Sequence, residues 1–210
     1  MMTARDAAVT SLVVLAFTGF IIFYAFGALV SHRVPIELEH IVHDAAYGYK
    51  VPIAAKFTMV GFFPAYLGAG IFSLLFGLIF RRFLRDALFA LASLLITWQV
   101  SDYFKTYFGR ERPEGELVFH ETSFSYPSGH AALAMAFYGA WAFFIWRSPI
   151  PGPFRFLICL ALAILIAGVG WSRLALGAHY LADVLGGYLL GFGFAALAVV
   201  ASRLRSAAHL

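Results

Sequence analysis

The chain has 210 residues, of which 62% are hydrophobic and only 12% are charged. With a mean hydropathy of +0.84, this composition excludes an ordinary soluble domain and indicates an integral membrane protein. Lys and Arg outnumber Asp and Glu by 15 to 11, but they are scattered between apolar runs. We therefore expect them to orient the chain in a membrane and to bind an anion, and we expect no nucleic-acid partner. The single cysteine, Cys159, allows neither a disulfide framework nor a Cys-based metal site.

Six apolar runs are long enough to cross a bilayer, which predicts an all-α bundle of six transmembrane helices. The expected spans cover about residues 7–30, 57–80, 87–104, 127–146, 154–171 and 180–200. Segment 31–55, between the first two spans, is mixed in character and predicts a loop with a short helix at the membrane interface. Because no internal repeat is evident, we interpret residues 1–210 as a single membrane domain.

Two local patterns refine these helices. Pro127 suits the first turn of the fourth helix, and Ser125 can cap that turn. Small residues allow helices to approach closely in a membrane. Five glycines are interpreted as such packing positions: Gly61, Gly68, Gly77, Gly187 and Gly191.

An even number of spans returns both termini to the same side of the membrane. That side carries eight Lys and Arg residues and the opposite side seven, which is almost no bias. Nine of the eleven acidic residues lie on the opposite side, and three of its cations are candidates for binding an anion. We therefore expect the side with the termini to be cytoplasmic.

Polar residues gather on the side away from the termini. The end of the third span, the start of the fourth, the end of the fifth and the start of the sixth emerge there together, because successive spans alternate in direction. The four clusters are Lys105 with Arg112 and Pro113, then Ser128, Gly129 and His130, then Arg173, and finally His179 with Asp183.

These side chains suit a phosphate. Ser128 and Gly129 fall in the first turn of a helix, where unpaired backbone N–H groups and the helix dipole favour an anion. Lys105, Arg112 and Arg173 add three positive charges, enough to bind a phosphate dianion and the charge that develops during its transfer. With so many cations supplied by the protein, we expect no metal and no other cofactor.

Two histidines complete the pattern. If a helix begins near Gly177, His179 and Asp183 are four residues apart on one face, so Asp183 can hold one imidazole nitrogen and leave the other free to attack. His130 can then serve as a separate proton donor. Displacement at a phosphorus ester requires both a nucleophile and a proton donor, and the unperturbed pKa of histidine suits both tasks.

Three motifs carry a resemblance to a known family. They are Lys105-(six residues)-Arg112-Pro113, Pro127-Ser128-Gly129-His130, and Ser172-Arg173-(five residues)-His179-(three residues)-Asp183. All three occur in order and without departure at a signature position. In this respect the chain resembles the type 2 phosphatidic acid phosphatase superfamily, and a six-helix bacterial member would account for its whole length.

The resemblance implies a role for each motif residue. His179 would form a phosphohistidine, Asp183 would fix its tautomer, and His130 would protonate the leaving oxygen and then activate water. The phosphoryl oxygens would be held by Lys105, Arg112, Ser128, Gly129 and Arg173. The family is metal-independent, and its bacterial membrane members act on the outer side of the cytoplasmic membrane.

The function expected from this pattern is hydrolysis of a lipid phosphate monoester or pyrophosphate. Candidate substrates are undecaprenyl pyrophosphate, phosphatidylglycerol phosphate, phosphatidic acid and a lipid A phosphate. A lipid-to-lipid phosphotransferase would use the same residues. A non-catalytic anionic-lipid transporter would need the cations but neither the paired histidines nor Asp183. We also expect substrate to reach the site sideways from the bilayer.

Other polar residues have weaker interpretations. His40, His43 and Asp44 have a spacing that could bind a metal, although a solvated loop is more common. Asp102 could pair with Lys105 or Arg173. Five residues beside the expected site are interpreted as solvated unless they shape substrate access: Glu111, Glu114, Glu116, His120 and Glu121.

Overall fold

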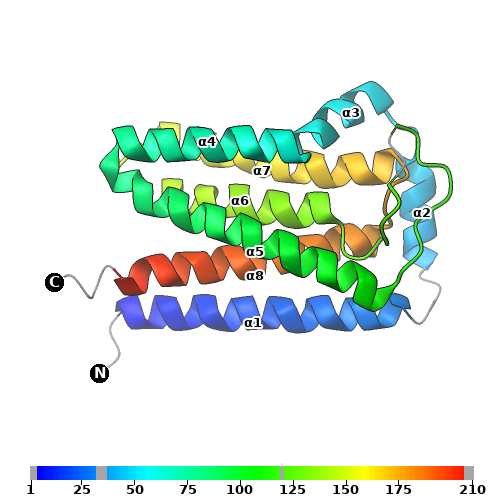
Figure 1. The fold of residues 1–210 in the computed structure, drawn as a ribbon, viewed down its shortest axis with the longest axis horizontal. Coiled ribbons are helices and arrows are strands. Elements are labelled where there is room, and N and C mark those ends of the chain that lie inside the picture. The colour runs from blue at the N-terminus through cyan, green and yellow to red at the C-terminus, as the bar shows by residue number, and fades with distance from the viewer. Residues whose placement is uncertain (1–3, 32–36, 119–120, 206–210) are drawn as a thin grey trace.

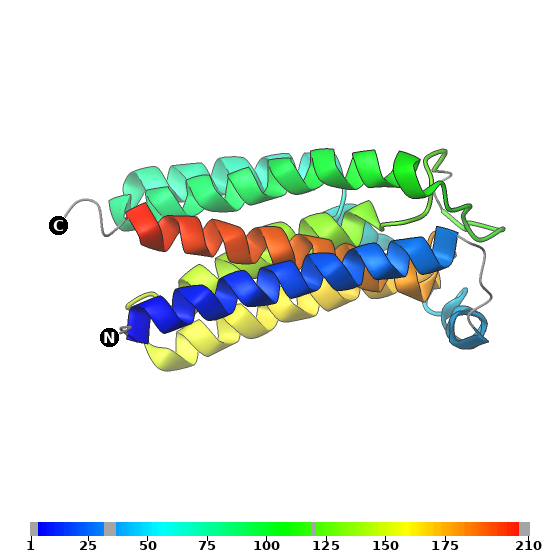
Figure 2. The same cartoon turned by 90° about the horizontal axis from the view of Figure 1, so that it is seen from below.

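The computed structural model describes residues 4–31, 37–118 and 121–205, and these residues form eight α-helices, one 3-10 turn (Arg81–Phe83) and no strand. The long helices run side by side in an elongated bundle (Figure 1, Figure 2). The expected all-α class is thereby confirmed. The helices are α1 (Ala4–Ser31), α2 (Glu37–Ala46), α3 (Val51–Val60), α4 (Phe63–Ile79), α5 (Leu84–Phe108), α6 (Gly129–Trp146), α7 (Gly152–Ala175) and α8 (Leu181–Arg205).

Helix length and composition agree with a membrane protein. Within the described part of the chain, five helices are long and apolar enough to cross a bilayer, and the number becomes six if the bent pair α3 and α4 counts as one span. The single helix expected at residues 57–80 is wrong, because α3 and α4 meet at an angle of 49°. The third expected span ends too early, since α5 continues to Phe108.

The break between α3 and α4 has a clear local cause. Phe62 is extended, and Pro64 in the first turn of α4 lacks the N–H that a continuous helix would need. Gly61 at the break faces His130, and a Cβ added there would collide with His130 Cδ2. The bend thus makes room for a candidate site residue at the start of α6.

The centre of the bundle is α6, which packs on α5, α7 and α8, while α8 also packs on α1. Glycines on α8 allow this close approach, as predicted. A Cβ on Gly187 would stand 2.5 Å from Ser128 O, and one on Gly191 would collide with Ala132 O. The same prediction is wrong for Gly68, where a Cβ would meet only open space.

The helix order places the polar clusters at one end. The start of α1 and the end of α8 lie together at one end of the bundle, whereas α2, the C-terminal ends of α5 and α7 and the starts of α6 and α8 lie at the other (Figure 1). Close packing of α6 on α8 therefore brings their N-termini, and the loops before them, into direct contact.

Candidate active site

His179 lies in the turn between α7 and α8 and is only 1% exposed. Gly177 in this turn has a φ of 69°, a left-handed conformation that glycine adopts without strain. Because α8 begins at Leu181, the expectation that a helix starting near Gly177 carries His179 is wrong. The turn itself brings His179 back over the first turn of α8, where Asp183 is located.

Ser125 stands between this histidine and Asp183. His179 Nδ1 is 3.2 Å from Ser125 Oγ and 3.5 Å from Asp183 Oδ2, and the latter distance is too long for a good hydrogen bond. Ser125 Oγ donates to Asp183 Oδ2 at 2.6 Å. Asp183 therefore holds the ring largely through Ser125, which was expected only as a helix cap.

The hydrogen-bond partners fix the tautomer of His179. Since the Ser125 hydroxyl donates its proton to Asp183, its oxygen accepts from Nδ1–H. On the other side of the ring, Arg112 Nη1 lies 3.3 Å from Nε2, and a guanidinium can only donate. The ring proton is thus on Nδ1, and the lone pair of Nε2 faces Arg112.

Electrostatics keeps this imidazole neutral. Burial lowers the pKa of His179 well below its ordinary value, and the positive charges of Arg112 and Lys105 lower it further. A neutral ring retains the lone pair on Nε2 at physiological pH. The geometry and the pKa therefore agree that Nε2 is the unprotonated nitrogen of this ring.

A carboxylate occupies the space beside Nε2. Glu121 accepts a hydrogen bond from Arg112 Nη2 at 2.7 Å through Oε2 and another from Arg173 Nη2 through Oε1. His130 Nδ1 is 3.8 Å from Oε1. Although burial by itself raises the pKa of Glu121, Arg173 and Arg112 lower it to about 2. The interpretation of Glu121 as a solvated residue is therefore wrong.

Two candidate cations also order the loop before α6. Lys105, in the last turn of α5 and not beyond it, donates to Phe124 O at 2.8 Å and to Ser123 Oγ at 3.3 Å. Arg112 Nε donates to Ser123 O at 2.6 Å. Asp102 is exposed, and Lys105 donates to these loop oxygens instead. Both cations thus reach the site from the α5 side.

The start of α6 completes the group. The helix begins at Gly129 and not at Pro127, with Ser128 as its N-cap. Ser128 N donates to Asp183 O at 2.9 Å, and a Cβ on Gly129 would lie 3.8 Å from Lys105 Cε. The first-turn N–H groups that remain have no acceptor within the helix.

Among the buried polar atoms that have no hydrogen-bond partner within the described residues are Ser128 Oγ, His130 Nε2 and Arg173 Nε. Orphaned buried polar atoms are uncommon and call for an explanation. All three belong to candidate residues, so a ligand that supplies acceptors and donors there would satisfy them. The structure thus brings the eight expected residues to one end of the bundle.

Two further charged residues lie behind Asp183, and the sequence reasoning assigned them no role. Arg110 donates to Asp183 Oδ1 at 2.6 Å and to Glu39 Oε2 at 2.6 Å. Glu39, from α2, also accepts from the backbone N–H of Ala182 at 2.9 Å. The only sequence signal for Arg110 is its position two residues before Arg112, and Glu39 has no signal of its own.

The region of His40, His43 and Asp44 does not form a metal cluster. Across residues 4–31, 37–118 and 121–205, no group of three or more His, Cys, Asp or Glu side chains is placed to hold a metal ion. His43 instead stacks on the ring of Tyr47, with 5.2 Å between centroids. His120, another residue expected beside the site, lies outside the described residues.

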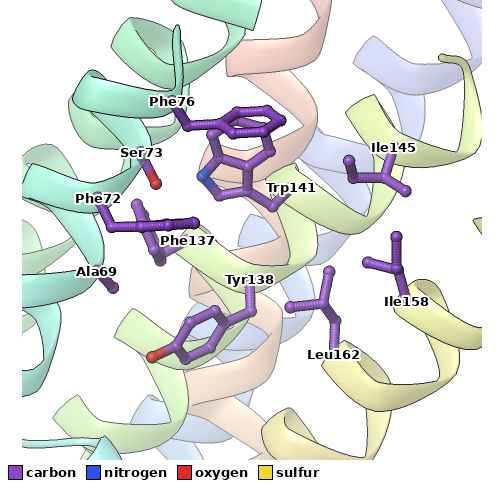
Figure 3. Close-up of a pocket in the computed structure, with 10 residues that line it drawn as sticks. All are labelled: Ala69, Phe72, Ser73, Phe76, Phe137, Tyr138, Trp141, Ile145, Ile158 and Leu162. Carbon is purple, nitrogen blue, oxygen red and sulfur yellow. The ribbon is translucent and has the colours of Figure 1, made fainter. Parts of the chain in front are cut away.

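Two cavities differ in their relation to the site. One of about 250 Å³ lies between α4, α6 and α7 and is lined by aromatic and aliphatic side chains with Ser73 (Figure 3). It contains none of the candidate residues. The other, of about 170 Å³, lies at the break between α3 and α4 and is lined by Lys105, Gly129 and His130, together with Phe63 and Trp98.

Comparison with known proteins identifies the family. The profile of the PAP2 superfamily matches residues 83–207, more than half of the chain and all three motifs. The chain belongs to the PAP2 superfamily. The resemblance inferred from the motifs is thereby confirmed.

Two relatives illustrate the range of PAP2 proteins similar to this chain. Phosphatidylglycerophosphatase B of Bacillus subtilis (strain 168) is 33% identical over 116 residues, which cover 55% of this chain and 57% of the relative. The putative undecaprenyl-diphosphatase YbjG of Escherichia coli (strain K12) is 33% identical over 104 residues, covering 47% and 46%. The chain thus spans about half the length of the curated relatives it matches.

Solved structures confirm the membrane fold. A transmembrane PAP2-type phosphatidylglycerolphosphate phosphatase from Bacillus subtilis superposes with a TM-score of 0.77 at 23% identity, covering 88% of this chain and 94% of the other. LpxE of Aquifex aeolicus superposes with a TM-score of 0.56 at 20% identity, covering 78% and 93%. Together with the apolar helices, the first structure supports an integral membrane protein.

Proposed function

We propose that this chain is a membrane lipid phosphatase that works through a phosphohistidine on His179. One observation carries the proposal: the guanidinium of Arg112 contacts both His179 Nε2 and the Glu121 carboxylate, which Arg173 binds as well. An anion is therefore held by two arginines next to a neutral imidazole nitrogen. A phosphoryl group that replaces the Glu121 carboxylate would be placed for attack by Nε2.

Each step then has a residue to perform it. His179 Nε2 attacks the terminal phosphorus, and the bond from this phosphorus to the leaving oxygen breaks. That oxygen belongs to the lipid alcohol in a monoester and to the lipid monophosphate in a pyrophosphate, and His130 gives it a proton. His130 next takes a proton from water, whose oxygen attacks the phosphohistidine, releasing inorganic phosphate and regenerating His179. Asp183 and Ser125 keep the ring proton on Nδ1 throughout. The proposed phosphoryl ligands are Lys105, Arg112, Arg173, the Ser128 hydroxyl and the first-turn N–H groups at Gly129.

The supply of positive charge by side chains supports a reaction without a metal or another cofactor. Arg112 and Arg173 bind the Glu121 carboxylate and Lys105 lies at the same end of the bundle, and a transferring phosphoryl group needs its equatorial oxygens neutralised. Phosphate release that continues in the presence of EDTA would support this part of the proposal.

The substrate is proposed to be a lipid phosphate monoester or pyrophosphate that enters sideways from the bilayer. The cavity at the α3–α4 break supports this route, because it joins Lys105 and His130 to an apolar rim. Phe63 and Trp98 form that rim, with 5.9 Å between ring centroids, and are 61% and 47% exposed. The names of the relatives favour phosphatidylglycerol phosphate and undecaprenyl pyrophosphate as the first lipids to test.

We further propose six spans in one membrane domain, with α3 and α4 together as the second span and α2 as an interfacial helix. Leu38 and Ile41 of α2 are largely exposed, as expected of a helix lying on lipid. At the end of the bundle away from His179, three arginines, Arg82, Arg147 and Arg203, line one cavity. This supports a cytoplasmic position for that end and an extracytoplasmic site in a bacterial inner membrane.

Phosphate release by purified protein in mild detergent tests the proposal. Wild type and His179→Ala would be compared on phosphatidylglycerol phosphate, undecaprenyl pyrophosphate, phosphatidic acid and lipid A, with EDTA present. Because the variant lacks the nucleophile, we expect a loss of roughly 1,000-fold or more in kcat. Activity in the variant, or none in wild type on any lipid, would contradict the proposal, and transfer to an added lipid acceptor would indicate a phosphotransferase.

A further inference from the structure

The region behind His179 contains a second group of charges that does not face the proposed phosphate. Asp183 is fully buried and accepts hydrogen bonds from Ser125 Oγ, from Tyr180 N at 2.8 Å and from Arg110. Arg110 and Glu39 lie on the Oδ1 side, whereas the His179 ring lies on the Oδ2 side. Neither Arg110 nor Glu39 contacts the carboxylate site at Glu121 directly.

Arg110 connects two buried carboxylates. Its Nη1 contacts Asp183 Oδ1, and its two terminal nitrogens contact Glu39 at 2.6 and 3.2 Å. Its guanidinium also lies over the Tyr180 ring, 4.4 Å from the centroid. Burial lowers the pKa of Arg110, but Asp183 and Glu39 raise it beyond its ordinary value. Arginine binds Glu39 here with two nitrogens in a planar fork while one of them also reaches Asp183, whereas lysine has a single nitrogen for both carboxylates.

Glu39 ties this arrangement to α2. It is only 4% exposed, which is unusual for a carboxylate unless it is paired. Besides Arg110, it accepts from Ala182 N, so it caps the first turn of α8 from a separate helix. Glu39 therefore fixes both the start of α8, which carries Asp183, and the guanidinium that holds Asp183 Oδ1.

We propose that Glu39 and Arg110 are positioning residues that hold Asp183 so that His179 keeps its proton on Nδ1 and presents Nε2 to phosphorus. With one oxygen of Asp183 fixed by Arg110, the other is directed at Ser125 and the imidazole. Because Glu39 binds both terminal nitrogens of Arg110, the guanidinium is held in place and Asp183 Oδ2 stays directed at Ser125. This inference rests on the proposed function, because His179 is its reactive residue.

The test compares Glu39→Gln with Glu37→Gln, an exposed glutamate of the same helix that undergoes the same change of charge. Glu39→Gln should lower kcat roughly 10- to 100-fold, the range seen when residues that orient the ligands of a metal site are replaced. KM and the inhibition constant Ki of inorganic phosphate should not change, because the cations that bind the phosphoryl group are untouched. Arg110→Lys, a second variant, should act in the same direction. Glu37→Gln should behave like wild type.

A readout that does not need turnover separates this proposal from the proposed function. In protein labelled with 15N-histidine, the His179 signals are identified by their loss in His179→Ala. Wild type should show a proton on Nδ1, and Glu39→Gln a mixture of tautomers. An inactive wild type would overturn the phosphatase proposal while this comparison still decides the positioning role. The inference would be overturned if Glu39→Gln left both the tautomer and kcat unchanged. It would also be overturned if the variant showed a lower kcat, a higher Ki of phosphate and a lower melting temperature together, because that result indicates general damage to the fold.

Discussion

Two groups of paired charges flank the imidazole of His179, and they differ in how far their carboxylates are exposed to solvent. In front of Nε2, Glu121 links Arg112 and Arg173, and its side chain is 23% exposed. Behind Nδ1, Arg110 links Glu39 and Asp183, whose side chains are 6% and 0% exposed. The front group places a carboxylate between two arginines, whereas the rear group places an arginine between two carboxylates. Glu121 is the most exposed of these carboxylates, and if it leaves, the buried Arg173 still has Glu116 as a partner at 3.3 Å.

The difference indicates a division of tasks. The front group consists of Arg112, Glu121 and Arg173, and the rear group of Glu39, Arg110 and Asp183. A front group that can exchange one anion for another suits binding of a phosphoryl group, whereas a buried rear group suits the orientation of a side chain. Substitutions in front should therefore change the affinity for phosphate. Substitutions behind should change kcat and leave that affinity alone.

The largest effect is expected from Arg112→Ala in the front group. The Arg112 guanidinium contacts both His179 Nε2 and the Glu121 carboxylate. We expect kcat/KM to fall roughly 100- to 1,000-fold, as on removal of a donor to the developing negative charge. The Ki of inorganic phosphate should rise in parallel. A variant that loses kcat but binds phosphate normally would contradict the assignment of Arg112 to the front group.

Ser125→Ala tests the rear group with a smaller expected effect. The substitution removes the hydroxyl between His179 Nδ1 and Asp183 Oδ2, so the ring loses its acceptor and the buried carboxylate loses a donor. We expect kcat to fall by about 10-fold, with the Ki of phosphate unchanged. Steady-state kinetics and phosphate inhibition measure both quantities. Weaker phosphate binding would place Ser125 in the front group instead.

Glu121→Gln should give the smallest change in phosphate affinity, and this change should be an increase. Removal of the charged carboxylate from Arg112 and Arg173 lowers the cost of admitting another anion, so phosphate and vanadate should both bind about 3- to 10-fold tighter, by the same factor. Because the pKa of Glu121 is lowered to about 2, the carboxylate remains charged at ordinary assay pH. The ratio between wild type and variant should therefore be independent of pH there.

The control for this prediction is Glu114→Gln, an exposed glutamate on the same loop. It changes the net charge equally, and its side chain is exposed to solvent, whereas Glu121 pairs with both arginines. Equal tightening in both variants would indicate a general charge effect. Weaker binding in Glu121→Gln would mean that the carboxylate chiefly holds the arginines in place.

The sequence alone predicted the features that depend on local chemistry. Apolar runs of bilayer length predict helices wherever they occur, and alternation of direction brings Lys105, Ser128, Arg173 and His179 to one end. Motif spacing identified the family. The predicted boundaries failed where a single local contact decides them. The example is the α3–α4 break, where Gly61 and Pro64 interrupt an apolar run.

Only the tertiary structure decided which charges pair. Glu121 and Glu114 are both acidic residues of one polar loop, and nothing in their neighbours separates the one that reaches two arginines from the one that faces water. Glu39 meets Arg110 from a helix 71 residues away in sequence. Such pairs depend on the path of loops and on desolvation by the packed bundle, and these are properties of the whole fold. The sequence therefore determined the fold class, the motifs and the end of the bundle where they meet, while the fold determined which partners orient His179.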